Sequence, residues 1–173
     1  MRKILVVVDM QNDFIDGALG TKEALAIVEN VKAKIREYDQ KDIFVTMDTH
    51  APDYLSTQEG RNLPVEHCIK GTEGWKLRSD IADLLPEAKV YEKPTFGSTA
   101  LAGDIAKIAA EEDIEIELIG LCTDICVVSN ALLLKAVMPE VTISVDPACC
   151  AGVTPESHEA ALKTMQMCQI MHK

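Results

Sequence analysis

Short apolar segments rich in β-branched residues recur along the chain, and segments with a helical spacing of apolar residues separate them. A short apolar run of this kind predicts a strand that is buried on both faces of a sheet. Strands that alternate with helices predict an α/β fold, in which helices cover both faces of a mostly parallel sheet. The five predicted strands are KILVVVD (3–9), DIFVTM (42–47), AKVYEK (88–93), IEIELIGL (114–121) and VTISVD (141–146).

The segments between these strands have the periodicity of helices. In TKEALAIVENVKAKIREY (21–38), the apolar residues Leu25, Val28, Val31 and Ile35 predict one buried helix face. The other predicted helices cover residues 79–86, 98–113, 124–138 and 154–167.

Capping residues and breaks in periodicity complete this prediction. Ser98 and Thr154 are suitable N-caps, and Pro155 suits the first position of the last helix. No period holds between residues 48 and 74, where Pro, Gly and Asn recur, so this segment is predicted to be a long loop. Long loops in compact domains are commonly functional. The segment CQIM (168–171) fits either an extension of the last helix or a final short strand.

The composition is that of a globular protein. The chain has 173 residues, 47% of them hydrophobic and 26% charged, which predicts one domain, 1–173, with a substantial core. The formal net charge of −11 argues against a nucleic acid or an anionic membrane as partner, because a polyanion would be repelled. The longest apolar run near the N-terminus, ILVVV, is too short for a signal or membrane segment, so we expect a cytoplasmic protein. Its six cysteines are expected to stay reduced, mostly as small core residues.

Reactive side chains follow four of the predicted strands, at the point where each strand ends. In open parallel sheets, ligands bind beyond the carboxyl ends of the strands. The concentration of reactive groups at this one rim therefore predicts an enzyme. In chain order, the residues are Asp9, Asp48, His50, Lys93, Cys122 and Cys126.

Cys126 is the candidate nucleophile. It lies in the first turn of a predicted helix, and a helix N-terminus or a nearby cation lowers the pKa of a thiol. Lys93 could supply the cation, and Asp9 could hold the lysine and pass a proton to a leaving amine. Taken singly, the three residues are better explained as a buried thiol, a solvated strand end and a turn cap. Together they favour nucleophilic catalysis, whereas packing is the favoured role of Cys122.

A second group of candidates lies at the start of the long loop and within it. Asp48 and His50 are separated by one residue, so their side chains point to the same side of an extended segment. His67 could return from the loop to complete a three-ligand metal site with open positions for water or substrate. Loop histidines commonly meet only solvent, but two of the four histidines fall here. The sequence thus favours a metal site, with His158 and His172 expected on the surface.

Four motifs occur in the order in which a known family has them. They are DMQNDFIDGAL (9–19), DTH (48–50) with PVEHCIKGTEGW (64–75), YEKPTFGST (91–99) and GLCTDICV (120–127). With them the chain resembles the isochorismatase-like cysteine hydrolases over nearly its whole length, and among these the nicotinamidases. The combination of D-x-Q-x-D-F with G-x-x-T-D-x-C-V is specific, whereas either motif alone is moderately so. The resemblance implies a three-layer α/β/α sandwich with a mostly parallel sheet of five or six strands.

The resemblance also implies a catalytic triad of Asp, Lys and Cys. This triad falls on Asp9, Lys93 and Cys126, the same residues that the strand ends favour. A cis peptide bond is implied shortly before the nucleophile, at Leu121–Cys122, together with an oxyanion hole formed by the backbone amides of Cys122 and Cys126. On this view Cys126 supplies the attacking sulfur, and Cys122 contributes its amide rather than its thiol.

Metal ligation is characteristic of the nicotinamidase branch, and Asp48, His50 and His67 match its ligands. Some members have an acidic fourth ligand a little before the second histidine. Glu59 is the candidate for it here, and a solvated loop carboxylate is an equally good reading of this residue. The implied cofactor is a divalent metal ion, with zinc favoured over manganese or iron.

The resemblance places Phe14 and Phe96 in an aromatic pocket for a pyridine ring, with Trp75 either nearby or in the core. One motif departs from the family, because the common Asp-Trp-His-Pro is replaced here by DTHA (48–51). The chain is also short for this branch, with little room for an elaborate lid. These departures leave the triad intact and leave the substrate open. Because family members are often oligomers, a homo-oligomer is expected.

Together, the residues and the resemblance predict a cysteine amidohydrolase that acts on a small-molecule amide. The favoured activity is that of a nicotinamidase, which hydrolyses nicotinamide to nicotinate and ammonia through a thioester. One alternative keeps the triad and changes the substrate to another small amide, a ureide or a vinyl ether. Another is a non-catalytic binding or regulatory domain on the same fold, which the complete triad disfavours.

Overall fold

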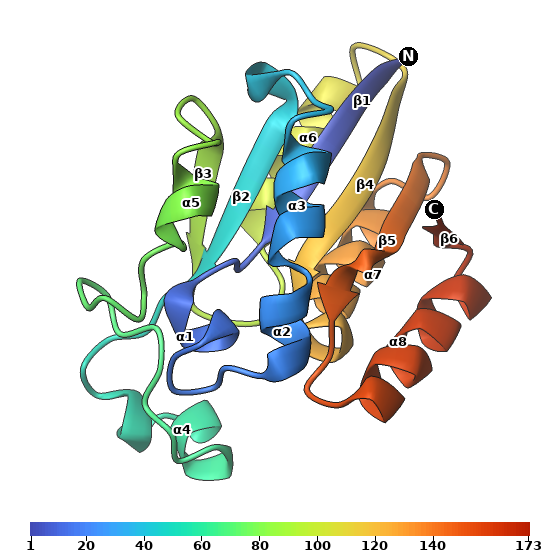
Figure 1. Ribbon diagram of the computed structural model, residues 1–173. Helices are drawn as coiled ribbons and strands as arrows, with labels where there is room; N and C mark the ends of the chain where they lie inside the picture. Colours follow the sequence, from blue (N-terminus) through green and yellow to red (C-terminus); the bar gives the residue numbers. More distant parts are fainter.

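The computed structural model describes residues 1–173 and is built around a sheet of six parallel strands (Figure 1). The strands lie in the order β3-β2-β1-β4-β5-β6, which confirms the predicted parallel sheet. The β5 strand continues beyond its predicted end, and β6 is the last short strand, formed after the final helix ends. The bounds are β1 (Arg2–Val8), β2 (Ile43–Asp48), β3 (Lys89–Lys93), β4 (Ile114–Leu121), β5 (Thr142–Ala151) and β6 (Met171–His172).

The central strand β1 shows why both faces of the sheet are covered. Successive side chains of a strand point to opposite faces. Ile4, Val6 and Val8 accordingly belong to one apolar cluster, and Leu5 and Val7 belong to a second one on the other face. All five are fully buried. The core is therefore two layers of apolar side chains, separated by the sheet.

Helices lie on both sides of the sheet, as a three-layer sandwich requires (Figure 1). The first cluster is completed by α6 (Thr99–Ala109), α7 (Val128–Val137) and α8 (Pro155–Met167). The second is completed by α1 (Asn12–Ile15), α2 (Lys22–Ala26), α3 (Val28–Ile35) and α5 (Ser79–Ala82). None of these helices is both long enough and apolar enough to cross a membrane.

Two predicted helices differ from the observed structure: the helix predicted over 79–86 ends at Ala82, and the one predicted over 21–38 is divided. The segment 21–38 forms two helices that meet at Ile27, and the side chain of Leu25 is half-exposed rather than buried. The buried stripe runs instead through Ala24, Ile27 and Val28 and continues along α3. These positions keep the spacing of three and four residues that one helix face requires, and Leu25 lies off that face.

The other predicted helix signals are present. Ser98 accepts a hydrogen bond from the Leu101 amide as the N-cap of α6, and Thr154 caps α8 by accepting from Ser157. The predicted long loop contains two short helical turns, η2 (Tyr54–Ser56) and α4 (Gln58–Asn62). A short turn, η1 (Gln40–Asp42), precedes β2.

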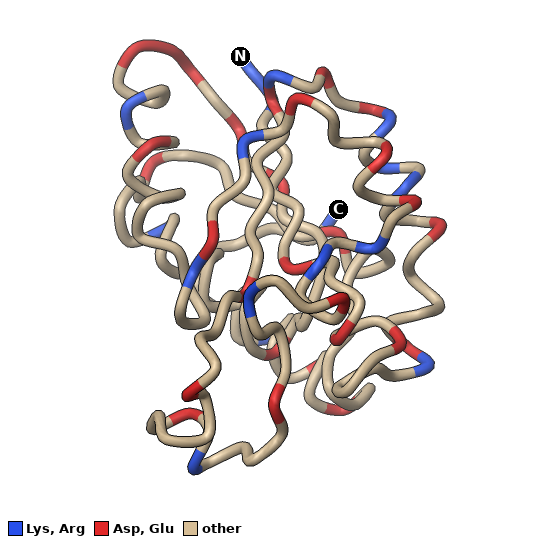
Figure 2. Tube along the Cα trace, turned by 90° about the vertical axis from the view of Figure 1, so that its left-hand side faces the viewer, with Lys and Arg blue, Asp and Glu red and all other residues tan.

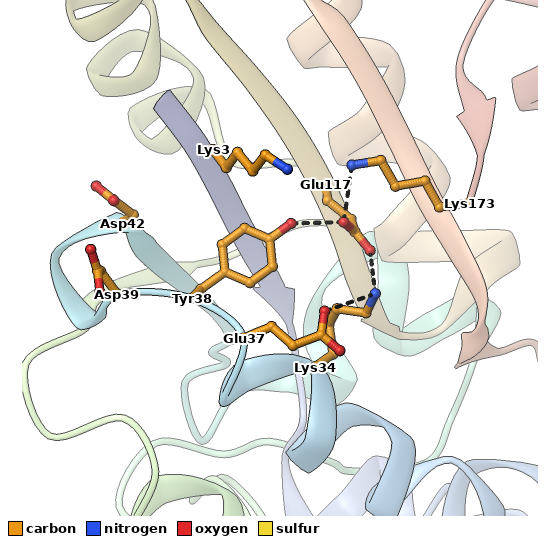
Figure 3. Close-up of a pocket in the computed structure, with 8 residues that line it drawn as sticks. All are labelled: Lys3, Lys34, Glu37, Tyr38, Asp39, Asp42, Glu117 and Lys173. Atoms are coloured by element: carbon orange, nitrogen blue, oxygen red, sulfur yellow. Dashed lines mark hydrogen bonds and ion pairs between the residues drawn. The ribbon is translucent and has the colours of Figure 1, made fainter. Parts of the chain in front are cut away.

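A polar cluster lies on the α3 side of the sheet, around Glu117 of β4 and Lys3 of β1 (Figure 3). Glu117 of β4 is buried there and accepts a hydrogen bond from the Tyr38 hydroxyl at 2.7 Å. The amines of Lys34 and Lys173 lie 3.1 and 3.2 Å from the same carboxylate. This cluster joins the end of α3 and the C-terminal residue to the sheet.

Charged residues of both signs are interspersed along the chain (Figure 2). The 28 acidic residues outnumber the 17 basic residues, which gives the net charge of −11. In this view Lys and Arg lie among Asp and Glu rather than forming one basic face. The excess negative charge is therefore spread over the molecule.

The strand order creates a crevice between β1 and β4. From β1 the chain adds β2 and β3 on one side and then returns to add β4, β5 and β6 on the other. Such a reversal is where open α/β sheets bind ligands, beyond the carboxyl ends of the strands. Gly120 allows the two strands to approach at this point, because its φ is +118° and a Cβ atom there would lie 2.1 Å from the Val8 carbonyl oxygen.

Candidate active site

The structure brings Asp9, Lys93 and Cys126 into contact at this crevice. Asp9 follows β1, Lys93 ends β3, and Cys126 lies in a π-helical turn, η3 (Thr123–Val127), that follows β4. The Lys93 amine lies 2.7 Å from Asp9 Oδ2 and 3.4 Å from Cys126 Sγ. All three side chains are buried. The lysine thus bridges a carboxylate and a thiol.

Asp9 is fixed by its backbone and by a neighbouring strand. Its φ is +47°, in the left-handed region that Asp adopts more readily than most residues. The Thr46 hydroxyl donates a hydrogen bond of 2.6 Å to Asp9 Oδ1, which leaves Oδ2 for Lys93. Thr46 was not among the predicted site residues, although a threonine in the otherwise apolar run IFVTM (43–47) was a signal for it.

Electrostatics make the three groups interdependent. Burial would lower the pKa of Lys93, but the negative charge of Asp9, together with that of Asp48, outweighs it and raises that pKa above its usual value. Burial also raises the pKa of the Asp9 carboxyl, and burial with the nearby Asp9 raises that of the Cys126 thiol. The resting thiol therefore faces a carboxylate that can accept a proton and a cation that can stabilise the resulting thiolate.

The turn that carries the nucleophile candidate begins at Cys122. The Leu121–Cys122 peptide bond is cis, at the predicted position. The Cys122 carbonyl accepts hydrogen bonds from the amides of Ile125 and Val127, whereas the Cys122 amide donates to no group of the protein. An amide without an internal partner is available to an oxyanion.

His158 departs from its predicted place on the surface. It is half-buried, and its Nδ1 lies 2.8 Å from the hydroxyl of the buried Thr123. His158 thus joins α8 to the turn that holds Cys126. His172 is exposed, as predicted.

The four predicted metal ligands also lie together. One ligand atom from each of Asp48, His50, Glu59 and His67 lies within 4.8 Å of the other three. Asp48 Oδ2 is 3.0 Å from His50 Nε2 and 3.4 Å from His67 Nε2. Glu59 Oε1 is 3.7 Å from both imidazole nitrogens. This group of two histidines and two carboxylates suits a divalent transition metal such as zinc.

The orientation of the histidines fits such a role. His67 Nδ1 lies 2.8 Å from the Val65 carbonyl oxygen, which directs Nε2 to the common centre. The ring of the fully buried Tyr54 packs against both imidazoles. Its centroid lies 4.7 Å from the ring centroid of His50 and 5.0 Å from that of His67. Tyr54 could not be predicted as a neighbour of these histidines, because its contacts depend on how the long loop folds. Burial would raise the pKa of Asp48, but hydrogen bonds to both histidines hold it below its usual range.

A cavity of about 60 Å³ lies beside Cys126, between the metal-ligand group and the nucleophile turn. It adjoins a larger, more open cavity of about 640 Å³. Phe14 is buried in its wall, and Phe96 is 42% exposed at the junction of the two cavities. Trp75 is not part of this wall and packs against the core, with its Nε1 donating to the Thr49 hydroxyl. The residues lining the smaller cavity are Phe14, Leu19, Asp48, Glu59, Leu63, His67, Phe96, Cys122, Ile125 and Cys126.

Comparison with known proteins identifies the family. The family model of the isochorismatase domain matches residues 3–172. The chain belongs to the isochorismatase family. This isochorismatase-family chain is 33% identical over 143 residues to an uncharacterized isochorismatase family protein, PncA of Bacillus subtilis (strain 168). The match covers 76% of this chain and 78% of that protein.

Solved structures of the same family have this fold. The pyrazinamidase/nicotinamidase of Streptococcus mutans UA159 matches with a TM-score of 0.84 and 28% identity, over 99% of both chains. The pyrazinamidase of Pyrococcus horikoshii, solved in complex with zinc, matches with a TM-score of 0.78 and 28% identity. That match covers 100% of this chain and 99% of the other. The predicted three-layer isochorismatase-like fold is therefore confirmed.

Proposed function

We propose that this isochorismatase-family protein is a cysteine amidohydrolase that converts nicotinamide to nicotinate and ammonia. The contact chain Asp9–Lys93–Cys126, which opens onto a small cavity beside two histidines and two carboxylates, carries the proposal. The likeness to structures named nicotinamidase or pyrazinamidase supports it. Asp9, Lys93 and Cys126 are the proposed catalytic residues.

The chemistry starts with the thiol. Asp9 accepts the Cys126 proton, and Lys93 stabilises the thiolate. Cys126 Sγ then forms a bond to the carboxamide carbon, and the backbone amides of Cys122 and Cys126 donate to the oxyanion. The C–N bond breaks as Asp9 returns its proton to the nitrogen, so that ammonia leaves and a thioester remains. Water attacks the thioester carbon while Asp9 accepts its proton; the C–S bond breaks, and the proton passes to the released Cys126 sulfur.

A divalent metal ion fits this reaction as a resident cofactor. Asp48, His50, His67 and Glu59 would hold it, and their donor set suits zinc, with manganese or iron as alternatives. When bound, such an ion would supply a Lewis acid to the substrate and to water. The chain's own contribution is to orient the ring, because the carboxamide must lie within reach of Cys126.

Two aromatic residues would hold the ring. Phe14 lines the cavity from α1, and Phe96 lines it from the loop after β3. Their positions at the cavity wall support apolar contact with a flat, single-ring substrate. Cytoplasmic location and assembly as a homo-oligomer stay predictions.

Ammonia release across a panel of small amides tests this function. The panel contains nicotinamide, an aliphatic amide and a ureide, each measured with added Zn²⁺, Mn²⁺ or Fe²⁺ and after chelation. A vinyl ether is followed separately by product analysis, because its hydrolysis releases no ammonia. The proposal expects the highest kcat/KM for nicotinamide and a loss of activity on chelation. Preference for the ureide or the vinyl ether would favour the alternative substrates. No turnover with any compound, together with a slowly alkylated Cys126, would favour a non-catalytic domain.

A further inference from the structure

Asn130 is a buried polar residue in the first turn of α7, one helical turn after Cys126. Its side chain is almost inaccessible, with 1% exposure for the residue. A buried amide in such a position needs partners for its two N–H groups and its oxygen. Asn130 Nδ2 donates to the Cys126 carbonyl at 2.8 Å and to the Phe96 carbonyl at 3.2 Å. Its Oδ1 accepts from the Ser98 amide at 2.9 Å.

These contacts also determine which way the amide group points. A rotation of the group by a half turn would put the NH₂ group against the Ser98 N–H and the oxygen against two carbonyl oxygens. Only the orientation described satisfies all three neighbours. One side chain therefore ties the turn that carries the nucleophile to two points of the loop between β3 and α6.

The loop between β3 and α6 carries Phe96. Phe96 is 42% exposed, and a residue exposed to this extent receives little support from packing alone. The backbone around it is held by Asn130 at Phe96 itself and at Ser98, the N-cap of α6. The contact between Lys93 and Cys126 uses none of these bonds. Asn130 thus holds the backbone of the nucleophile turn and the backbone of the Phe96 loop at a fixed spacing, without contacting the side chains of Lys93 and Cys126.

We propose that Asn130 is a positioning residue that sets the distance between Cys126 and the Phe96 wall, and so determines how tightly a ring-bearing amide is bound. The inference rests on the proposed function for its substrate. An apolar wall contacts the ring equally in the ground state and in the transition state. Loosening the wall therefore raises KM and leaves kcat nearly unchanged.

Two variants and a matched control test this role. In Asn130→Thr, the hydroxyl can still donate to the carbonyl four residues earlier, that of Cys126, but it is too short to reach the loop. In Asn130→Ala all three bonds are lost. Ser129→Ala is the control, because Ser129 Oγ donates to the Ile125 carbonyl of the same turn and makes no side-chain bond to the Phe96 loop.

Three measurements are made on each protein: KM and kcat for nicotinamide, the alkylation rate of Cys126 by iodoacetamide, and hydrogen exchange of the Ser98 amide. For Asn130→Thr we expect KM to rise about tenfold, since a buried hydrogen bond is worth roughly that factor. Its kcat and alkylation rate should stay within about threefold of wild type, and Ser98 exchange should accelerate at least about tenfold. Ser129→Ala should change neither KM nor Ser98 exchange.

Several outcomes would overturn the inference. An Asn130→Thr protein with wild-type KM and wild-type Ser98 exchange would leave Asn130 as a polar core residue only. A fall in kcat and alkylation rate at constant KM would place its effect on the nucleophile instead. An equal rise in KM for Ser129→Ala would assign the effect to general loosening of the turn. Should Asn130→Ala fail to fold, Asn130→Thr decides.

The failure of the proposed function is a separate result. A wild-type protein that releases no ammonia from nicotinamide refutes that function. The claim that Asn130 holds the Phe96 loop is then tested by hydrogen exchange of the Ser98 amide in Asn130→Thr. Faster exchange than in the wild type upholds the claim, and an unchanged rate overturns it.

Discussion

Replacing Lys93 with methionine removes the cation at the centre of the site, and we expect it to destabilise the fold measurably. The amine lies 2.7 Å from Asp9 Oδ2 and 3.8 Å from Asp48 Oδ1, and both aspartates are buried. At an effective dielectric constant of about 20, these attractions amount to about 6 and about 4 kcal/mol. Much of this energy only offsets the desolvation of the charges. The expected net loss from leaving a buried charge unpaired is about 3–5 kcal/mol.

The orphaned group in this variant is Asp9 rather than Asp48, because Asp48 keeps hydrogen bonds with His50 and His67. Asp9→Asn removes that remaining charge. Asn tolerates the left-handed backbone at this position, and it keeps an oxygen for the Thr46 hydroxyl. The double variant Lys93→Met with Asp9→Asn should therefore recover at least about 2 kcal/mol relative to Lys93→Met alone.

Urea unfolding of the wild type, both single variants and the double variant completes the cycle, with ammonia release measured on the same preparations. All three variants should be inactive. The double variant should therefore regain stability relative to Lys93→Met without regaining activity. Strictly additive stability losses would refute the argument. They would mean that Lys93 and Asp9 do not share one buried ion pair.

Three further predictions concern other groups. Cys126→Ala should reduce kcat at least about a thousandfold because it removes the attacking atom, whereas Cys122→Ala should keep activity within about tenfold. Equal losses of activity in the two folded proteins would contradict the assignment of Cys126 as the nucleophile. His67→Ala should lose metal by elemental analysis and lose amide hydrolysis, yet keep a Cys126 that iodoacetamide alkylates at the wild-type rate; full metal content with full activity would make His67 a plain loop histidine. Glu117→Gln should lower the free energy of unfolding by about 1–3 kcal/mol at pH 7, because burial raises the pKa of Glu117 but Tyr38 and Lys34 outweigh it and hold it below its usual value. A depressed carboxyl pKa gives stability that is present above the unfolded-state pKa of about 4.5 and is lost as the pH falls through the folded-state pKa. The stability difference between the wild type and this variant should therefore narrow as the pH falls below about 4.5, and a difference that does not narrow would count against the ion-pair account.

The parts of this molecule that could be predicted from the sequence depend on local pattern and on a general rule of parallel sheets. A run such as ILVVV predicts a buried strand because the side chains on both of its faces are apolar. Once the strands are known, their carboxyl ends must share one rim, and this brings Asp9, Lys93 and Cys126 together without knowledge of any distance. The caps at Ser98 and Thr154 were equally local.

The features that could not be predicted depend on contacts between distant segments. Leu25 fits a helical face by spacing, but the face that is buried is chosen by the packing of the helix against the sheet. Tyr54 reaches the two histidines only through the folding of a loop, and His158 reaches the turn that holds Cys126 only through the docking of α8. For Glu59 the family resemblance supplied a candidate, and only the course of the loop brings it within 3.7 Å of both histidines.

The lysine of the proposed triad is carried by the edge strand of the sheet. The five-residue strand β3 pairs only with β2, so half of its backbone groups have no strand beside them. Edge elements with few neighbours open at lower free energy than the centre of a fold. A transient detachment of β3 would withdraw Lys93 from Asp9 and Cys126 while the other five strands stayed paired. Heat or mild denaturant should therefore inactivate this enzyme before the molecule as a whole unfolds. Residual activity would then report the fraying of one strand rather than global stability.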